Sequence, residues 1–332
     1  MSTLHVALLG FGTVGKGIYE TIGKQQDHLR AVIGKEVKVS TIVVKDLGHH
    51  ADYQGSAKLT TDMQEIIQDQ KIDVVMEAIV GKQPAFDYLQ QCIIQGKHVI
   101  TANKEMFAAY GCALQKLAEK HHTKIAYEAT TAGGIPIIAT IQQLLQANHI
   151  NNIQAILNGT SNFILTAMRT DHLSFDKALE KAQELGYAEA DPTNDIDGHD
   201  AYFKAMILSE LVFGRKPAPE NIQVTGIRDI SSDFLQSACP KRIKHLVTLA
   251  RTDGDIICRI EPQALSETHP LFAVEGVDNA VHLQTDILGN LTLTGPGAGA
   301  LPTASAMIED LCTIVKEEQA VLPIEKALAP HY

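Results

Sequence analysis

The chain has 332 residues, of which 45% are hydrophobic and 20% charged, a balance typical of a soluble globular protein with room for two domains. Its formal net charge of −11 argues against partners such as nucleic acid or anionic membranes, so a phosphate-bearing ligand would have to be held locally. The five scattered cysteines form no C-x-x-C pair, and we expect a cytoplasmic protein without signal peptide, membrane span, disulfide frame or structural zinc.

Apolar strands alternate with helices in the first part of the chain. Helices are expected to about residue 30 and over 84–96 and 102–122, and strands over 4–9, 37–44, 73–80, 98–102 and 124–129. This alternation predicts parallel strand pairing and a doubly wound α/β domain of the Rossmann type over residues 1–130.

The pattern changes after a glycine-rich turn at 131–136. A helix to about residue 148, a strand and then a loop over 150–162, and further helices around an acidic segment are expected next. Short strands follow from about 221 to 294. We expect an α+β domain for substrate binding and dimerisation over 131–300, and a C-terminal helix over 301–332 that packs back on the nucleotide domain.

A glycine motif follows the first strand and opens a helix: Gly10, Phe11, Gly12, Thr13, Val14 and Gly15. In such a motif the first glycine permits a tight turn, the second lets a pyrophosphate approach, and the third lets helix and strand pack closely. The helix N-terminus then offers N–H groups to the phosphates. The motif predicts dinucleotide binding, with a glycine turn that holds no ligand as the alternative.

The second strand ends in a sequence that bears on the choice of cofactor. An acidic residue there suits the ribose of NAD and a basic one suits NADP, and the chain offers Lys45 followed by Asp46. We predict that NADP is accepted and NAD tolerated, with Lys45 in contact with the cofactor. Ile79, near the end of the strand over 73–80, is another candidate cofactor contact.

Asn103 and Lys104 directly follow the strand over 98–102. Ligands of open α/β sheets bind at the carboxyl ends of strands, so Lys104 is predicted to face the nicotinamide end of the cofactor. There it could hold an anionic substrate or donate a proton to an oxyanion. The alternative is a solvated lysine in the first turn of a helix, where a cation is disfavoured.

Residues 186–204, GYAEADPTNDIDGHDAYFK, contain five carboxylates followed by one lysine. An EF-hand calcium loop aligned on Gly198 would require a glutamate where Lys204 stands, which excludes that reading. We expect Asp191 to form a turn and Asp197 to cap the next helix.

Asp200 and Lys204 lie one turn apart on that helix, which is apolar around much of its circumference. This predicts a partly desolvated pair, a feature that often marks active sites. A buried structural ion pair is the alternative.

Six segments together resemble the homoserine dehydrogenase family, in the family's order along nearly the whole chain: GFGTVG (10–15), TANK (101–104), YEATTAGGIPII (127–138), LNGTSNFIL (157–165), the acidic segment (186–204) and GPGAGALPTASA (295–306). The resemblance implies NAD(P)-dependent interconversion of L-aspartate 4-semialdehyde and L-homoserine, on the route to threonine and methionine. It makes Lys104 and Lys204 the candidate proton donors, beside Asp200. The implied substrate contacts are Glu189, Asp195, Asn158, Gly159 and Thr160.

The resemblance also implies a monovalent cation, commonly sodium, held by the Glu128 side chain and by the carbonyls of Thr131, Gly133 and Ile135. The chain departs from the family here, because TAGG stands where V-G-G-G or V-G-A-G is usual. Carbonyl ligands tolerate such a change of side chains. Gly299 is expected to approach the cofactor, with a simple turn before the last helix as the alternative.

The family further suggests at least a homodimer. Since many members carry an added C-terminal regulatory domain and this chain ends at Tyr332, we expect weak or no inhibition by threonine. Two other interpretations stay open: another two-domain dehydrogenase acting on an amino acid, and a dinucleotide sensor without catalytic activity.

Overall fold

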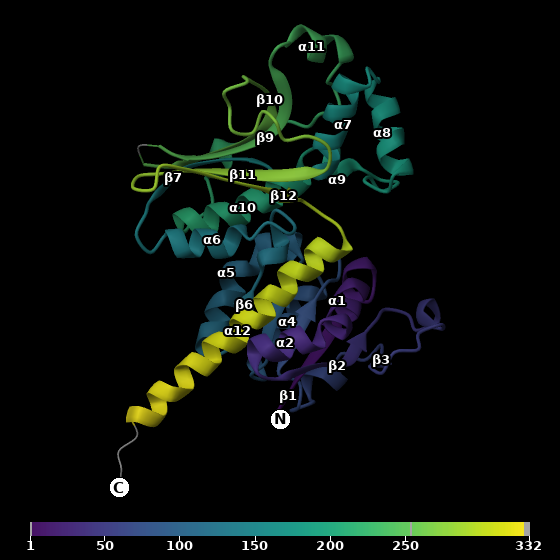
Figure 1. Cartoon of the computed structure of the whole chain (residues 1–332), viewed down its shortest axis with the longest axis vertical. Helices are drawn as coiled ribbons and strands as arrows, with labels where there is room; N and C mark the ends of the chain where they lie inside the picture. Colours follow the sequence, from purple (N-terminus) through teal and green to yellow (C-terminus); the bar gives the residue numbers. More distant parts are fainter. Residues whose placement is uncertain (1, 253, 329–332) are drawn as a thin grey trace. The chain divides into compact units, whose positions relative to one another are not determined.

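The structure, a computed structural model, describes residues 2–252 and 254–328. It divides into two compact units, the first made of the residues up to Thr130 together with those from Gly299 onward, and the second of Thr131–Ala298. Figure 1 shows both units, and each contains a sheet in which six of the described strands pair. Among the residues that the structure describes, no helix is both long and apolar enough to cross a membrane.

The sheet of the first unit is parallel throughout, with the strand order β3-β2-β1-β4-β5-β6. Its strands are β1 (Thr3–Leu9), β2 (Glu36–Val43), β3 (Lys58–Thr60), β4 (Val74–Glu77), β5 (His98–Thr101) and β6 (Ile125–Ala126). The strand order reverses between β1 and β4, which is where such sheets open a crevice for a ligand at their carboxyl ends. The predicted Rossmann-type fold is therefore confirmed.

The helices of this unit cover the sheet: α1 (Thr13–Lys24), α2 (Gln26–Ile33), α3 (Gln64–Ile67), α4 (Ala85–Ile94), α5 (Lys104–Lys120) and α12 (Ala300–Leu328), with short 3₁₀ turns η1 (Gly48–His50) and η2 (Glu128–Thr130). The C-terminal helix α12 lies along α1 and α2 (Figure 1). Ala304, Met307, Leu311 and Val315 recur at helical spacing and enter the same apolar core as Ile18 of α1. That apolar stripe is what attaches α12 to the unit.

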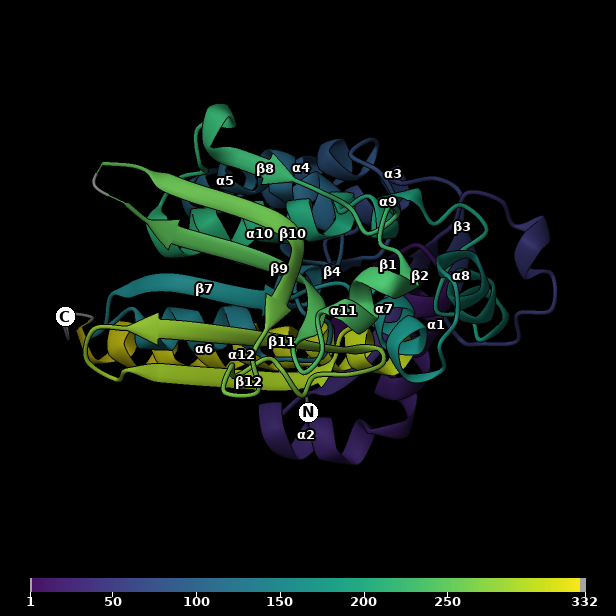
Figure 2. The ribbon, with the colours of Figure 1, turned by 90° about the horizontal axis from the view of Figure 1, so that it is seen from above.

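The second unit has a mixed sheet with the order β12-β11-β7-β9-β10-β8, in which only β8 pairs in parallel. Its strands are β7 (Ile150–Ile156), β8 (Ile222–Val224), β9 (Arg242–Arg251), β10 (Ile256–Leu265), β11 (Asp278–Thr285) and β12 (Asn290–Pro296). Figure 2 shows these strands side by side, with α6 (Ile137–Leu144) and α10 (His199–Phe213) behind them. The remaining helices are α7 (Gly159–Thr170), α8 (Phe175–Glu184), α9 (Thr193–Ile196), α11 (Ser232–Ser237) and the 3₁₀ turn η3 (Pro219–Asn221).

Several predicted boundaries were wrong. The helix expected to residue 30 is two helices, because Gln25 leaves the helical conformation and the next residue, Gln26, bonds through its side chain to the Val37 carbonyl. The loop expected before residue 162 is already helical, since the Asn158 side chain caps α7 by accepting a hydrogen bond from the Ser161 N–H at 2.7 Å. Strands β9 and β10 are ten residues each because they form one long hairpin.

Candidate active site

The glycine motif forms a turn that is tightly packed beneath and open above. Gly10 has φ +95°, and a Cβ on it would lie 2.8 Å from the Ala78 carbonyl oxygen and 2.9 Å from Ile79. A Cβ on Gly15 would lie 2.2 Å from the Gly10 carbonyl oxygen, whereas one on Gly12 would meet nothing within 4 Å. The open space at Gly12, directly before α1, fits a pyrophosphate at a helix N-terminus.

The other residues of the motif divide between main-chain and side-chain roles. Thr13 and Val14 form the first turn of α1, where N–H groups have no partner within the helix. The Phe11 ring is buried and makes edge contacts with Tyr19, His50 and Tyr53 at centroid distances of 5.8, 5.6 and 5.4 Å. Any contact of Phe11 with a cofactor would therefore be made by its main chain.

The end of β2 presents both Lys45 and Asp46 to solvent. Lys45 is exposed, while the Asp46 carboxylate accepts a hydrogen bond from the Gly48 N–H at 2.8 Å and so closes its own turn. The preceding residues, Val43 and Val44, are buried and apolar. This end of the strand therefore offers an exposed lysine and an exposed carboxylate, the residue types that suit NADP and NAD respectively.

Asn103 holds the turn that carries Lys104. Its side chain accepts a hydrogen bond from the Met106 N–H at 3.0 Å and donates one to the Gly81 carbonyl at 2.8 Å. Lys104 is consequently the first residue of α5, at the carboxyl edge of the parallel sheet. Lys104 thus follows the carboxyl end of β5, as expected, and its contact with a cofactor or substrate stays a prediction.

Glu77, which the sequence analysis did not single out, is fully buried beneath this turn. Its carboxylate accepts hydrogen bonds from the Thr101 hydroxyl at 2.5 Å, the Ile79 N–H at 2.8 Å and the Asn103 amide at 3.5 Å. Burial raises the pKa of Glu77 to about 7. In the sequence it is one acidic residue at the end of an apolar run, a position that gives no sign of burial.

In the second unit, the predicted Asp200–Lys204 pair is present and buried. The Lys204 ammonium lies 2.7 Å from an Asp200 carboxylate oxygen and donates a hydrogen bond to the Leu157 carbonyl at 2.6 Å. The Asn158 amide donates to Asp200 at 3.0 Å and to Asp195 at 2.7 Å. The start of α7 and the start of α10 thus converge on one polar network.

The remaining predicted substrate contacts differ in their setting. The Thr160 hydroxyl is buried and donates to the Tyr187 carbonyl at 2.6 Å, and a Cβ on Gly159 would lie 2.6 Å from the Val277 carbonyl oxygen. The Glu189 side chain is exposed, and in the described part of the chain no hydrogen bond or ion pair joins it to this network. Hydrogen bonds therefore join Asn158 and Asp195 to the Asp200–Lys204 pair, while Gly159 and Thr160 follow Asn158 in the first turn of α7.

The expected cap at Asp197 was wrong. Gly198 occupies the N-cap of α10 with φ +87°, because only a left-handed residue turns the chain from α9 directly into α10. Asp197 instead forms a two-bond pair with Arg228 at 3.1 Å for each bond. The expected turn at Asp191 is confirmed, since its carboxylate accepts a hydrogen bond from the Thr193 N–H at 3.1 Å.

Comparison with known proteins places both units in one family. Residues 10–128 match the family described as homoserine dehydrogenase, NAD binding domain, and residues 136–312 match the family described as homoserine dehydrogenase. The chain belongs to the homoserine dehydrogenase family. This membership makes it an oxidoreductase with a nicotinamide cofactor.

Individual relatives agree with this assignment. The homoserine dehydrogenase of Lactococcus lactis is 39% identical over 326 residues, which cover 96% of this chain and 75% of the relative. The crystal structure of a homoserine dehydrogenase from Thiobacillus denitrificans superposes with a TM-score of 0.92 at 38% identity, covering 96% and 75% of the two chains. A hyperthermophilic archaeal homoserine dehydrogenase in complex with NADPH superposes with a TM-score of 0.81 at 28% identity, covering 95% and 98%.

The resemblance to homoserine dehydrogenases also implied four ligands of a monovalent cation: Glu128, Thr131, Gly133 and Ile135. Glu128 is buried, and its N–H donates to the Asp310 carboxylate at 3.0 Å, where burial raises the pKa of Asp310 to about 8. In the second unit, Thr131 is buried, Gly133 has φ +62°, and the Ile135 carbonyl accepts a hydrogen bond from the Ile137 N–H at 2.8 Å. Carboxylate and carbonyl oxygens are hard donors of the kind that suits an alkali cation, with Glu128 in the first unit and the other three residues in the second.

Gly299, the last predicted cofactor contact, has φ +117° and immediately precedes α12. The adjacent Ala300 packs on α1, where a Cβ on Gly17 would lie 3.0 Å from the Ala300 carbonyl oxygen. The structure places Gly299 in the cofactor-binding unit, at the point where the chain re-enters it.

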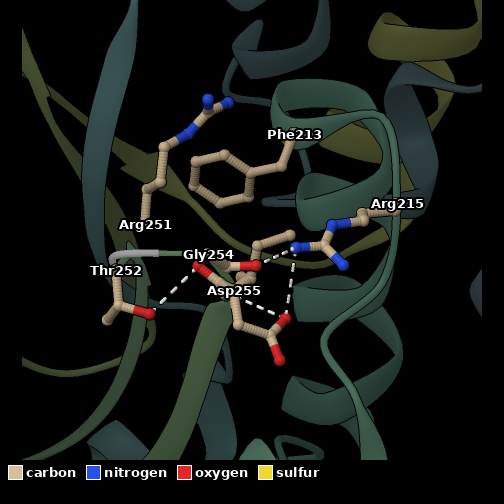
Figure 3. A pocket seen from close by; sticks show the side chains of 7 residues that line it. Phe213, Arg215, Arg251, Thr252, Gly254 and Asp255 are labelled. Atoms are coloured by element: carbon tan, nitrogen blue, oxygen red, sulfur yellow. Dashed lines mark hydrogen bonds and ion pairs between the residues drawn. The ribbon is translucent and has the colours of Figure 1, made fainter.

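A separate pocket of about 210 Å³ lies at the other end of α10 (Figure 3). Figure 3 shows Arg215 directed at the Gly254 carbonyl and Asp255, at 3.0 and 3.3 Å, and Arg251 beside the Phe213 ring. Phe213 follows Lys204 by nine residues, about 13 Å along the helix. This pocket is therefore distinct from the polar network.

Proposed function

We propose that the chain interconverts L-aspartate 4-semialdehyde and L-homoserine with NADP as the preferred cofactor, and that Lys204 is the proton donor. The observation that carries this proposal is the buried Lys204 ammonium, held between the Asp200 carboxylate at 2.7 Å and the Leu157 carbonyl at 2.6 Å. Lysine ammonium groups are seldom buried unless they are paired, and such pairs concentrate at functional sites. Family membership supplies the reaction.

The nicotinamide supplies the hydride when it is bound. As the aldehyde carbon is reduced, negative charge develops on its oxygen, and the Lys204 ammonium can stabilise that charge and transfer a proton to it. The Asp200 carboxylate, 2.7 Å from the Lys204 ammonium, orients it before the transfer. In the oxidation of homoserine the neutral amine of Lys204 takes the hydroxyl proton.

The substrate also carries an ammonium and a carboxylate. We assign its ammonium to Asp195 and Glu189, because a cation is held best by carboxylates. Asn158 fixes Asp195 through a hydrogen bond of 2.7 Å, whereas Glu189 is exposed and would have to close on the substrate as it binds. Lys104 is the second lysine candidate, placed at the start of α5 for binding an anionic group.

The preference for NADP rests on the end of β2. Lys45 and Asp46 are both exposed there, but the Asp46 carboxylate already accepts a hydrogen bond from the Gly48 N–H at 2.8 Å, whereas Lys45 can reach a 2′-phosphate. Replacing Lys45 by Ala should raise KM for NADP several-fold and leave KM for NAD nearly unchanged. Lys38→Ala, an exposed lysine of the same strand, is the matched control and should change neither value. Strict use of NAD by the unaltered chain would contradict the preference.

We also propose, on the family resemblance, a sodium ion at Glu128, Thr131, Gly133 and Ile135. ²³Na relaxation should show a bound ion that Glu128→Gln releases.

The family resemblance further suggests a homodimer formed through the sheet of the second unit. Light scattering should give twice the mass of one chain, and the mass of a single chain would contradict the dimer.

Absorbance at 340 nm with NADP and L-homoserine at alkaline pH tests the reaction. Absorbance should rise with homoserine and stay flat with other L-amino acids. Reduction with another amino acid alone would favour a different amino-acid dehydrogenase, and cofactor binding without turnover of any substrate would favour a dinucleotide sensor.

A further inference from the structure

The Leu157 carbonyl accepts two side-chain hydrogen bonds. One comes from the Lys204 ammonium at 2.6 Å, and the other comes from the amide of Asn279 at 3.0 Å. Asn279 lies on β11 and is completely buried. Its amide oxygen has no hydrogen-bond partner among the described atoms, so the bond to Leu157 is what sets the amide's orientation.

We propose that Asn279 is a positioning residue that fixes the Leu157 carbonyl and thereby the place of the Lys204 ammonium. The inference rests on the role proposed above for Lys204. It extends that role to a side chain on another strand that touches neither Asp200 nor Asp195 in the described hydrogen-bond network.

Strand pairing explains how Asn279 reaches this carbonyl. Strand β11 runs antiparallel to β7, and Ala280 lies opposite Ile156, so Asn279 stands next to the residue that follows β7. That residue is Leu157, and the next one, Asn158, caps α7 and bonds to both acidic residues of the network. The Leu157 carbonyl therefore lies between the end of β7 and Asn158, the residue that bonds to Asp195 and Asp200.

The Asn279 amide is clamped as well as bonded. A Cβ on Gly297 would lie 2.1 Å from the Asn279 Cγ, so only glycine at 297 lets the chain lie against this amide. A Cβ on Gly133 would in turn lie 2.4 Å from the Gly297 carbonyl carbon. Two close backbone approaches thus remove the freedom of the amide to rotate away from Leu157.

Loss of the Asn279 donor would leave the Leu157 carbonyl held by Lys204 alone. Without the bond from Asn279 the Leu157 carbonyl could move, and the Lys204 ammonium bonded to it would move as well. A displacement on the order of 1 Å at a reacting group can lower the rate about 100-fold. Because Asn279 itself bonds to Leu157 and to neither Asp195 nor Asp200, the loss should appear more in kcat than in KM.

Two substitutions and a matched control test this. Asn279→Leu keeps the volume but removes the donor, and its kcat should fall on the order of 10- to 100-fold with KM for homoserine within about two-fold. Asn162→Leu is the control, because Asn162 is equally buried and its amide also donates to main-chain carbonyls, those of Gly276 and Asp278 at 3.0 and 3.3 Å. The control should lose thermal stability but keep kcat.

Asn279→Asp adds a measurement that a purely structural role would not affect. In its protonated form the new carboxyl can still donate to Leu157, and in its ionised form it cannot. The ratio of its kcat to that of the unaltered chain should therefore fall as pH rises. The titratable groups of this network include Asp200 beside Lys204, Asp195 joined through Asn158, and the buried His245, whose pKa is lowered by burial and which Asp200 influences. All three are present in both proteins being compared.

The outcomes separate the inference from the proposal beneath it. If Lys204→Ala retains kcat, the proposed role of Lys204 is wrong. If Lys204→Ala loses kcat while Asn279→Leu behaves like Asn162→Leu, only the role of Asn279 is wrong. Should Asn279→Leu fail to fold, a kcat ratio for Asn279→Asp that does not change with pH would overturn the inference.

Discussion

Replacement of the buried Glu77 by Gln should change how the stability of the protein depends on pH. Burial raises the pKa of Glu77 from 4.5 to about 7, so the folded protein keeps a proton that the unfolded chain has already lost. Stability from this group is complete below pH 4.5 and is lost as pH rises through about 7. At about 1.4 kcal/mol for each pH unit, the loss is roughly 3 kcal/mol.

Glutamine at position 77 cannot ionise and is nearly the same shape. It changes the hydrogen bonds with the Thr101 hydroxyl and the Ile79 N–H by a fixed amount, which shifts stability equally at every pH. The pH-dependent part belongs to the carboxyl group alone. Relative to the unaltered protein, Glu77→Gln should therefore gain roughly 3 kcal/mol between pH 4.5 and 8.

Urea unfolding followed by circular dichroism at several pH values measures this difference, since the chain contains no tryptophan for fluorescence. Glu65→Gln is the control, because Glu65 is not buried and a hydrogen bond from Lys58 lowers its pKa. The difference in unfolding free energy between Glu65→Gln and the unaltered protein should change only near and below pH 4.5. Parallel curves for Glu77→Gln and the unaltered protein between pH 5 and 8 would show that Glu77 does not titrate in this range in the folded protein.

Two further predictions concern the cofactor loop and the acidic segment. Gly15→Ala should abolish NADPH binding measured by cofactor fluorescence, because its Cβ would lie 2.2 Å from the Gly10 carbonyl oxygen. Gly23→Ala on the same helix is the control and should bind NADPH normally, since a Cβ there meets nothing within 4 Å. Asp200→Asn should lower kcat at least ten-fold by removing the charge beside Lys204. Asp197→Asn, which affects the solvent-accessible pair with Arg228, should keep kcat and lower the free energy of unfolding in urea by at most about 1 kcal/mol.

The parts of the fold that could be predicted from sequence are those dictated by local patterns. Alternating apolar strands and helices predicted the parallel sheet, and the spacing of Asp200 and Lys204 predicted their pair. The break at Gln25 was missed because nothing in the local composition interrupts the helical pattern there. It depends on the pairing of Gln26 with Val37 on another element.

The parts of the site that could not be predicted depend on contacts between distant segments. Asn279 is 122 positions from the Leu157 carbonyl that it binds, and Glu77 is 24 positions from Thr101. A single Asn in a strand or a single Glu at a strand end can have many hydrogen-bond partners, and the partner it has depends on the register of the sheet. The wrong cap at Asp197 has a similar cause, since its carboxylate is taken by Arg228, 31 positions away.

The kinetics of Lys204→Ala, with and without an added primary amine, measure the proposed proton transfer. If Lys204 is the proton donor, kcat should fall by about 10²- to 10⁴-fold, KM for homoserine should change little, and a small alkylamine should restore part of kcat. A variant that keeps kcat and only raises KM would show that Lys204 binds the substrate and does not donate the proton.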